Sequence, residues 1–72
     1  MSLLAQAFIV EKYGLRLGVE QLAEVFSLAP KTIYNQVSSG SFPVPTYVDS
    51  GQRWADARDV AARFDELRQR AL

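Results

Sequence analysis

The sequence of 72 residues contains no cysteine and no histidine. Without cysteine there is no disulfide framework and no thiolate metal site. The two absences together exclude histidine acid–base chemistry, cysteine and Ser-His nucleophiles, and almost every kind of zinc site. The carboxylates do not have the loop spacing of a calcium or magnesium site. We therefore expect a protein that is not an enzyme and that holds no metal and no cofactor.

An excess of charge of one sign is also absent, because eight Lys and Arg residues balance eight Asp and Glu residues. Net charge therefore gives no support to nucleic-acid binding, which only the distribution of charge can favour. No apolar run is long enough to cross a bilayer. The run from Leu3 to Val10 lacks a basic leader and a small-residue cleavage site. We expect one small cytoplasmic domain over residues 1–72, with a marginal core and no membrane partner.

Residues 19–40 predict two short helices joined by a tight turn. The first helix carries apolar residues spaced for one buried face: Val19, Leu22, Ala23, Val25 and Phe26. Pro30 stands where the second helix begins, a position that tolerates proline because the first N–H groups have no intrahelical partner. Ile33 and Val37 share one face of this helix, and Gly40 ends it. This is the layout of a helix-turn-helix.

The second of these helices, residues 30–39, is the candidate reader of DNA. Its outer face and flanks carry polar side chains: Lys31, Thr32, Asn35, Gln36 and Ser39. Asn and Gln pair bidentately with adenine, Lys meets guanine or phosphate, and Thr and Ser serve either. Tyr34 is intermediate, with a hydroxyl that can reach a phosphate. No acidic residue occurs between Phe26 and Val48. From this helix alone, an ordinary solvated polar face explains the pattern equally well.

Residues 46–55 predict a short β-hairpin. The stretch Asp49–Gln52 forms its turn, in which Gly51 supplies a positive φ. We expect Trp54 in the core, because a small domain needs its only tryptophan buried. Phe42, which precedes the hairpin, is expected to plug the core beneath the two-helix motif.

Residues 1–14 predict an N-terminal helix that Ser2 can cap. Its apolar surface is wider than one stripe. The helix therefore either covers the core or forms an oligomer contact through Leu4, Phe8 and Ile9.

Residues 57–71 predict a C-terminal helix that Asp56 caps. Its charged residues are spaced for ion pairs on a solvated face, Asp59 with Arg63 among them. Arg58, close to the hairpin in sequence, is a further candidate for a phosphate contact.

Several fragments of the chain form an ordered set: Leu22-Ala23, Thr32-Ile33-Tyr34, Gly40, Phe42-Pro43-Val44-Pro45, Arg53-Trp54 and Asp59-Val60. This set, within residues 17–64, resembles the small winged-helix DNA-binding proteins of the AlpA/excisionase group, relatives of the MerR-type DNA-binding domain. The resemblance implies a winged helix-turn-helix, mainly α with a small β-hairpin wing. It also implies that an extended segment at Leu15–Leu17 pairs with the wing. The wing would contact the DNA backbone or minor groove through residues at and beside its tip: Ser50, Gly51, Gln52 and Arg53.

The same resemblance implies a small regulator of the phage or mobile-element type, which acts in DNA recombination as an excisionase or regulates transcription. Reading helices in this group are usually richer in Arg and Lys, whereas this one has only Lys31. The basic residues expected near phosphate are Lys31, Arg53, Arg58 and Arg16. They are fewer than the roughly six to ten contacts that specific regulators make. We therefore expect a homodimer or cooperative binding on double-stranded DNA. The alternative is a protein-interaction module of the same fold that binds a recombinase, a repressor or RNA polymerase.

Overall fold

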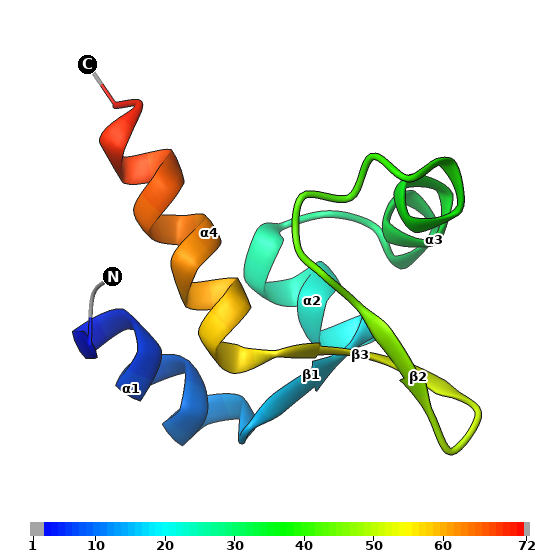
Figure 1. Ribbon diagram of the computed structural model, residues 1–72, viewed down its shortest axis with the longest axis horizontal. Coiled ribbons are helices and arrows are strands. Elements are labelled where there is room, and N and C mark those ends of the chain that lie inside the picture. The colour runs from blue at the N-terminus through cyan, green and yellow to red at the C-terminus, as the bar shows by residue number, and fades with distance from the viewer. Residues whose placement is uncertain (1–2, 72) are drawn as a thin grey trace.

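A computed structural model describes residues 3–71 of the chain. Within this range, four helices and one three-stranded antiparallel sheet follow one another along the sequence. The elements are α1 (Leu3–Tyr13), β1 (Arg16–Gly18), α2 (Val19–Phe26), α3 (Pro30–Ser39), β2 (Tyr47–Asp49), β3 (Gln52–Asp56) and α4 (Ala57–Gln69). Helices α1 and α4 pack together on one side of the molecule, and α3 and the β2–β3 hairpin lie on the other (Figure 1). The expectation of a mainly helical chain with a small hairpin is confirmed.

The sheet has β3 at its centre and β1 and β2 at its edges. Leu17 of β1 pairs with Ala55 of β3, and both side chains are fully buried on the inner face. On the other side of β3, Tyr47 of β2 pairs with Trp54. The expected pairing of an extended segment after α1 with the hairpin is therefore confirmed.

Helices α2 and α3 begin and end at residues with defined backbone roles. The Gly18 N–H donates to Oε1 of Gln21 at 2.9 Å, as in one half of a capping box. After α2, Ser27 adopts the left-handed conformation with φ 57° and turns the chain toward α3. Pro30 occupies the first turn of α3, and Gly40 closes that helix with φ 75°. The predicted roles of Pro30 and Gly40 are confirmed.

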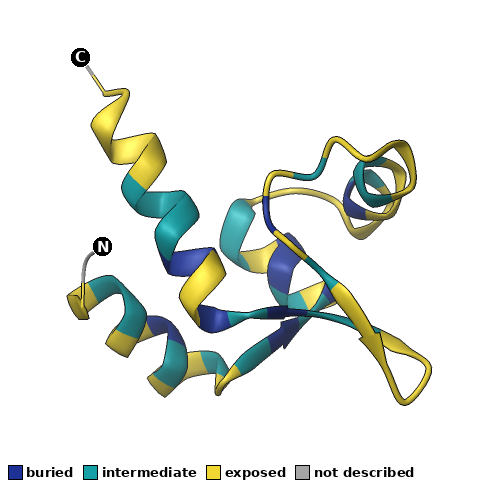
Figure 2. Ribbon diagram, viewed as in Figure 1, coloured by how far each residue is buried: buried dark blue, intermediate teal, exposed yellow. Residues whose placement is uncertain are grey.

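The core lies where α2, α3, α4 and the inner face of the sheet meet (Figure 2). Its largest fully buried side chains are Leu17, Leu22, Ile33 and Val60. Beside them, the Phe26 ring stacks on Phe64 with ring centroids 5.0 Å apart and meets Phe42 edge-on at 6.1 Å. These half-buried rings join the segment after α3 to α4. Phe42 therefore packs against the core as predicted.

Helix α1 turns one face to the core and another to solvent (Figure 2). Ile9 is only 4 % exposed and belongs to the core. It stands roughly 100° around the helix from Phe8, which is 65 % exposed, as is Leu4 at 82 %. Ile9 is therefore not part of the exposed face, whereas Leu4 and Phe8 are. The predicted cap Ser2 lies outside the described residues.

Helix α4 ends at Gln69, before the predicted end at residue 71. Its last residues are exposed, so no packing holds a further turn. Arg63 pairs with Glu66, three residues further on, at 3.2 Å, and not with Asp59 as predicted. Both spacings place charges on the same side of a helix, and the sequence alone does not choose between them.

Trp54 lies on the outer face of the sheet, not in the core as predicted. Neighbouring side chains of a strand point to opposite faces, and Ala55 takes the buried inner position of β3. The half-buried indole packs instead over Gly18, where an added Cβ would come 3.7 Å from the ring. The indole therefore lies within van der Waals distance of β1 at Gly18.

Candidate nucleic-acid interface

One face of α3 anchors the helix, and the opposite face is open to solvent. Ile33 is fully buried and Val37 is half-buried. At roughly 100° per residue, Lys31, Asn35 and Ser38 stand on the opposite side, and all three are exposed. Ser38 is an addition to the predicted contacts. Its helical spacing from Lys31 and Asn35 places it on the same face, so the sequence contained the signal for this contact.

The other predicted contacts of α3 are less available. Gln36 lies on the side of the helix that faces α4, where it lines a hollow with Arg63. The Ser39 hydroxyl donates to the Gln36 carbonyl at 3.1 Å and lies 2.7 Å from the hydroxyl of Ser41. Thr32 is half-buried. The structure therefore groups Lys31 and Asn35, but not Gln36, on the open face, and it uses the Ser39 hydroxyl to close the helix.

The hairpin turn is built from two residues with positive φ. Asp49 pairs with Gln52 across Ser50, with φ 53°, and Gly51, with φ 78°. Two consecutive positive φ angles are typical of the type I′ turn, whose twist suits antiparallel strands. The positive φ of Gly51 was predicted, and that of Ser50 was not. Because the turn extends beyond the body of the molecule, Ser50, Gly51 and Gln52 are exposed at its tip (Figure 1).

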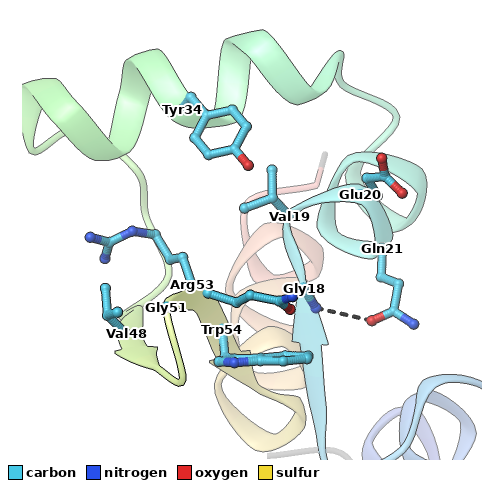
Figure 3. A pocket seen from close by; sticks show the side chains of 10 residues that line it. Gly18, Val19, Glu20, Gln21, Tyr34, Val48, Gly51, Arg53 and Trp54 are labelled. Carbon is cyan, nitrogen blue, oxygen red and sulfur yellow. Dashed lines mark hydrogen bonds between the residues drawn. The ribbon is translucent and has the colours of Figure 1, made fainter.

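An open groove of about 660 Å³ lies between α3, the start of α2 and the hairpin. Tyr34 projects from α3 with its hydroxyl toward Val19, and Arg53 extends from β3 on the hairpin side, with its guanidinium turned away from that hydroxyl (Figure 3). Gln52 lines the same groove. The structure thus brings together the predicted α3 contact Tyr34 and the predicted hairpin contacts Gln52 and Arg53.

The electrostatics of this groove favour an anion at the end where Arg53 lies. Its Nη1 donates to the Thr46 hydroxyl at 2.9 Å, and its other N–H groups are donors that a phosphate can use. Among residues 3–71, no carboxylate forms an ion pair with Arg53 or with Lys31. Glu20 lines the groove from the first turn of α2, so the end near α2 is less favourable to phosphate.

Arg16 lies across the outer face of the sheet. Its guanidinium sits 3.9 Å from the centre of the Trp54 ring and donates to Oδ2 of Asp49 at 2.7 Å. Hydrogen bonding to Asp49, and then to Tyr47, raises the pKa of Arg16 above its usual value. The pair neutralises the carboxylate that stands next to the hairpin turn. It also occupies Arg16, so this residue is not a free cation for phosphate.

Arg58 lies away from this groove. Its side chain donates to both carboxylate oxygens of Asp56, at 3.0 and 2.8 Å, and it shares a hollow with Gln6 and Leu15 beside α1. The hydrogen bonds from Arg58 lower the pKa of Asp56. Since α1 and α3 lie on opposite sides of the molecule (Figure 1), the structure does not bring Arg58 to the other predicted contacts.

Within residues 3–71, no group of three or more carboxylates is placed to hold a metal ion. No helix in this range has both the length and the apolar character that crossing a membrane requires.

Comparisons of the chain with protein-family models, with curated proteins and with solved structures find no match.

Proposed function

We propose that this protein is a sequence-specific DNA-binding protein of the winged helix-turn-helix type. In this proposal α3 enters the major groove, and the β2–β3 hairpin acts as the wing beside it. One observation carries the proposal: Tyr34 of α3 and Arg53 of the hairpin line one groove, next to the exposed Lys31 and Asn35. The major groove of B-DNA is about 12 Å wide and admits an α-helix. The resemblance to the AlpA/excisionase group supports the same arrangement.

The exposed residues divide by chemistry into two roles. Asn35, at the centre of the open face of α3, suits a bidentate contact with adenine, and Lys31 suits guanine or phosphate. The Arg53 guanidinium and the Tyr34 hydroxyl lie at the side of this face and suit the phosphate backbone. The amide of Gln52 and the hairpin turn add backbone contacts. Base contacts would then come from α3, and the hairpin would fix its register on the duplex.

The small number of available cations bears on how many copies bind. Arg16 and Arg58 are paired with aspartates, which leaves Lys31 and Arg53 as the predicted phosphate contacts free of ion pairs within residues 3–71. Specific regulators commonly make roughly six to ten phosphate contacts. One copy therefore holds a site weakly, and we propose that several copies bind together. The protein would act in the cytoplasm as a small regulator that directs a recombinase as an excisionase or controls a promoter.

The test is a gel-shift titration of the purified protein on DNA from the neighbourhood of its own gene, over a series of salt concentrations. The wild type is compared with the double variant Asn35→Ala, Arg53→Ala. Arg68→Ala is the matched control, because it removes an exposed cation near the far end of α4. We expect discrete complexes that weaken steeply with salt for the wild type and the control, and none for the double variant.

Failure of all three proteins to bind any fragment at low salt would overturn the proposal. The second candidate function would then replace it: a protein-interaction module whose partner is a recombinase, a repressor or RNA polymerase. The exposed apolar residues of α1, Leu4 and Phe8, are the observation that favours this second candidate.

A further inference from the structure

Helix α1 carries an apolar surface on the side away from the core. The α1 outer face consists of Leu3, Leu4, Ala7 and Phe8. Its three large side chains are between 65 % and 82 % exposed. The inner side of the same helix is also apolar, with Ile9 buried and Val10 packed against the core. Helix α1 is therefore apolar on two sides, although Gln6, Glu11 and Lys12 interrupt its surface, and an exposed apolar face of this kind marks an interaction site.

We infer that the α1 outer face binds a second copy of this chain, with the two α1 helices antiparallel about a two-fold axis. Leu4 and Phe8 are four residues apart on one side of α1, the spacing of a seam between two helices packed at a shallow angle. In the antiparallel register that sets Leu4 level with Glu11 of the second copy, Phe8 stands opposite Ala7 of the second copy. The large side chain then meets the small one, and the two-fold axis repeats the contact.

The residue sizes within the face suit a contact with a copy of itself. Phe8 is the bulkiest side chain of the face and its neighbour Ala7 is small, so in this register each ring meets a methyl group. In a two-fold contact each copy supplies one Phe8 and one Ala7, so each Phe8 ring meets an Ala7 of the other copy.

The charges of α1 favour the antiparallel direction. A parallel pair would bring Glu11 next to Glu11 of the second copy. The antiparallel pair instead sets Glu11 near the N-terminal end of the other helix, where the helix dipole is positive. The chain has a formal net charge of zero, so two copies approach without overall repulsion.

The area of the face suits a weak dimer. A phenylalanine such as Phe8 buries about 150–250 Å² in each copy, and Leu3 and Leu4 extend the contact. Neighbouring side chains add to this, and stable specific interfaces begin at about 1,200 Å². Because a core this small is marginal by itself, a second copy also adds apolar burial to the fold.

This inference deepens the proposed function by naming the partner that supplies further phosphate contacts. Helix α1 lies on the opposite side of the molecule from α3 (Figure 1). The contact therefore leaves both DNA-binding faces open, and it doubles the set formed by Lys31 and Arg53. Since α1 is remote from the groove, self-association is measurable in the absence of DNA.

Sedimentation equilibrium without DNA tests the contact. We compare the wild type with the double variant Leu4→Glu, Phe8→Glu, and with Val48→Glu as a control that alters an exposed apolar residue of the hairpin, 61 % exposed. Glutamate is a good helix former and suits the first turn of a helix, so circular dichroism should show the double variant folded. We expect a wild-type dimer that the double variant weakens at least about tenfold and the control leaves unchanged.

Because the chain has no cysteine, single-cysteine variants report the direction of the helices. The antiparallel register brings position 7 of the two copies together near the axis, whereas the two positions 11 lie about 10 Å apart along the helices. That separation exceeds the reach of a disulfide. We expect rapid oxidation to a disulfide dimer for Ala7→Cys and not for Glu11→Cys.

Two results would overturn the inference: a wild type that stays monomeric at every concentration tested, or a disulfide dimer that forms with Glu11→Cys and not with Ala7→Cys. The proposed function is judged separately. A dimer that binds no DNA overturns only the proposed function. A strict monomer that binds DNA overturns only the α1 contact.

Discussion

Arg16 on β1 and Asp49 at the end of β2 form an ion pair 2.7 Å long that spans the central strand β3. Trp54 of β3 lies under the guanidinium, 3.9 Å from it. The two edge strands are thus joined over the middle strand by a charge pair and a cation–π contact. We call the Arg16–Asp49 pair and the contact of Arg16 with Trp54 the clamp. Because the hairpin carries Gln52 and Arg53, the clamp holds these two residues in position at one side of the candidate interface.

Removing Arg16 should loosen the hairpin and uncover the indole. Trp54 is the only tryptophan, so its fluorescence reports this site alone. We expect Arg16→Ala to increase quenching of Trp54 by acrylamide. High salt should shift the wild type in the same direction, because both partners of the pair are partly exposed and are screened. Arg68→Ala should change nothing, and equal quenching in all three proteins would contradict the clamp.

Substituting the free cations should change the salt dependence of DNA binding. Arg53→Ala and Lys31→Ala should each lower the slope of log affinity against log salt by about one unit. Arg58→Ala should leave the slope unchanged, because its charge is held by Asp56 beside α1. The measurement is a fluorescence-anisotropy titration at several salt concentrations. A loss of slope with Arg58→Ala would show that the DNA reaches the α1 side of the molecule.

The Asn35 side chain should contribute to the sequence specificity of DNA binding and not to the affinity for DNA of any sequence. We expect Asn35→Ala to cost about 1–3 kcal/mol on the preferred site, the usual value of one bidentate base contact. Affinity for unrelated DNA of the same length should change little. Competition between the two DNAs measures the ratio directly. An equal loss on both would reassign Asn35 to the phosphate backbone.

Local backbone chemistry allowed much of the fold to be predicted. Proline fixes φ, and glycine accepts a positive φ, so Pro30 and Gly40 identify the ends of α3 without any knowledge of packing. Asp56 identifies the start of α4 in the same way. These residues act through their own geometry and their nearest neighbours along the chain.

Which side of an element faces the core was harder to predict, because it depends on distant residues. Arg53, Trp54 and Ala55 fit either face of a strand, and the small Ala55 turned out to be the inner residue. A helix as apolar as α1 likewise has no single inner stripe, so Ile9 could not be separated from Phe8 by sequence. The partners of charged residues depend on tertiary placement too, which explains why Arg16 and Arg58 seemed available.

Asp56 should stabilise the protein through its cap on α4. Its carboxylate accepts the Arg58 N–H at 2.8 Å, so we expect Asp56→Ala to cost about 1 kcal/mol in urea unfolding at neutral pH. Asp56→Asn keeps a capping oxygen and should cost less.

The pKa of Asp56 is lowered in the folded state, mainly by the hydrogen bond from the Arg58 side chain. This stabilisation is therefore complete above the ordinary carboxyl pKa of about 4, and it is lost as the pH falls through the lowered value. The loss of stability on acidification should be smaller in Asp56→Asn than in the wild type.

Replacing Ser27, in the turn between α2 and α3, by glycine should stabilise the protein. Its φ of 57° brings Cβ close to the following carbonyl, a cost of roughly 1–2 kcal/mol for a residue other than glycine. Glycine avoids this cost but loses more entropy on folding, so we expect Ser27→Gly to stabilise the protein by about 0.5–1 kcal/mol. Ser38→Gly is the matched control, because Ser38 lies within α3, where glycine should lower stability. Urea unfolding of both variants measures the difference. A loss of stability with Ser27→Gly would show that the serine side chain itself holds the turn that sets α3 against α2.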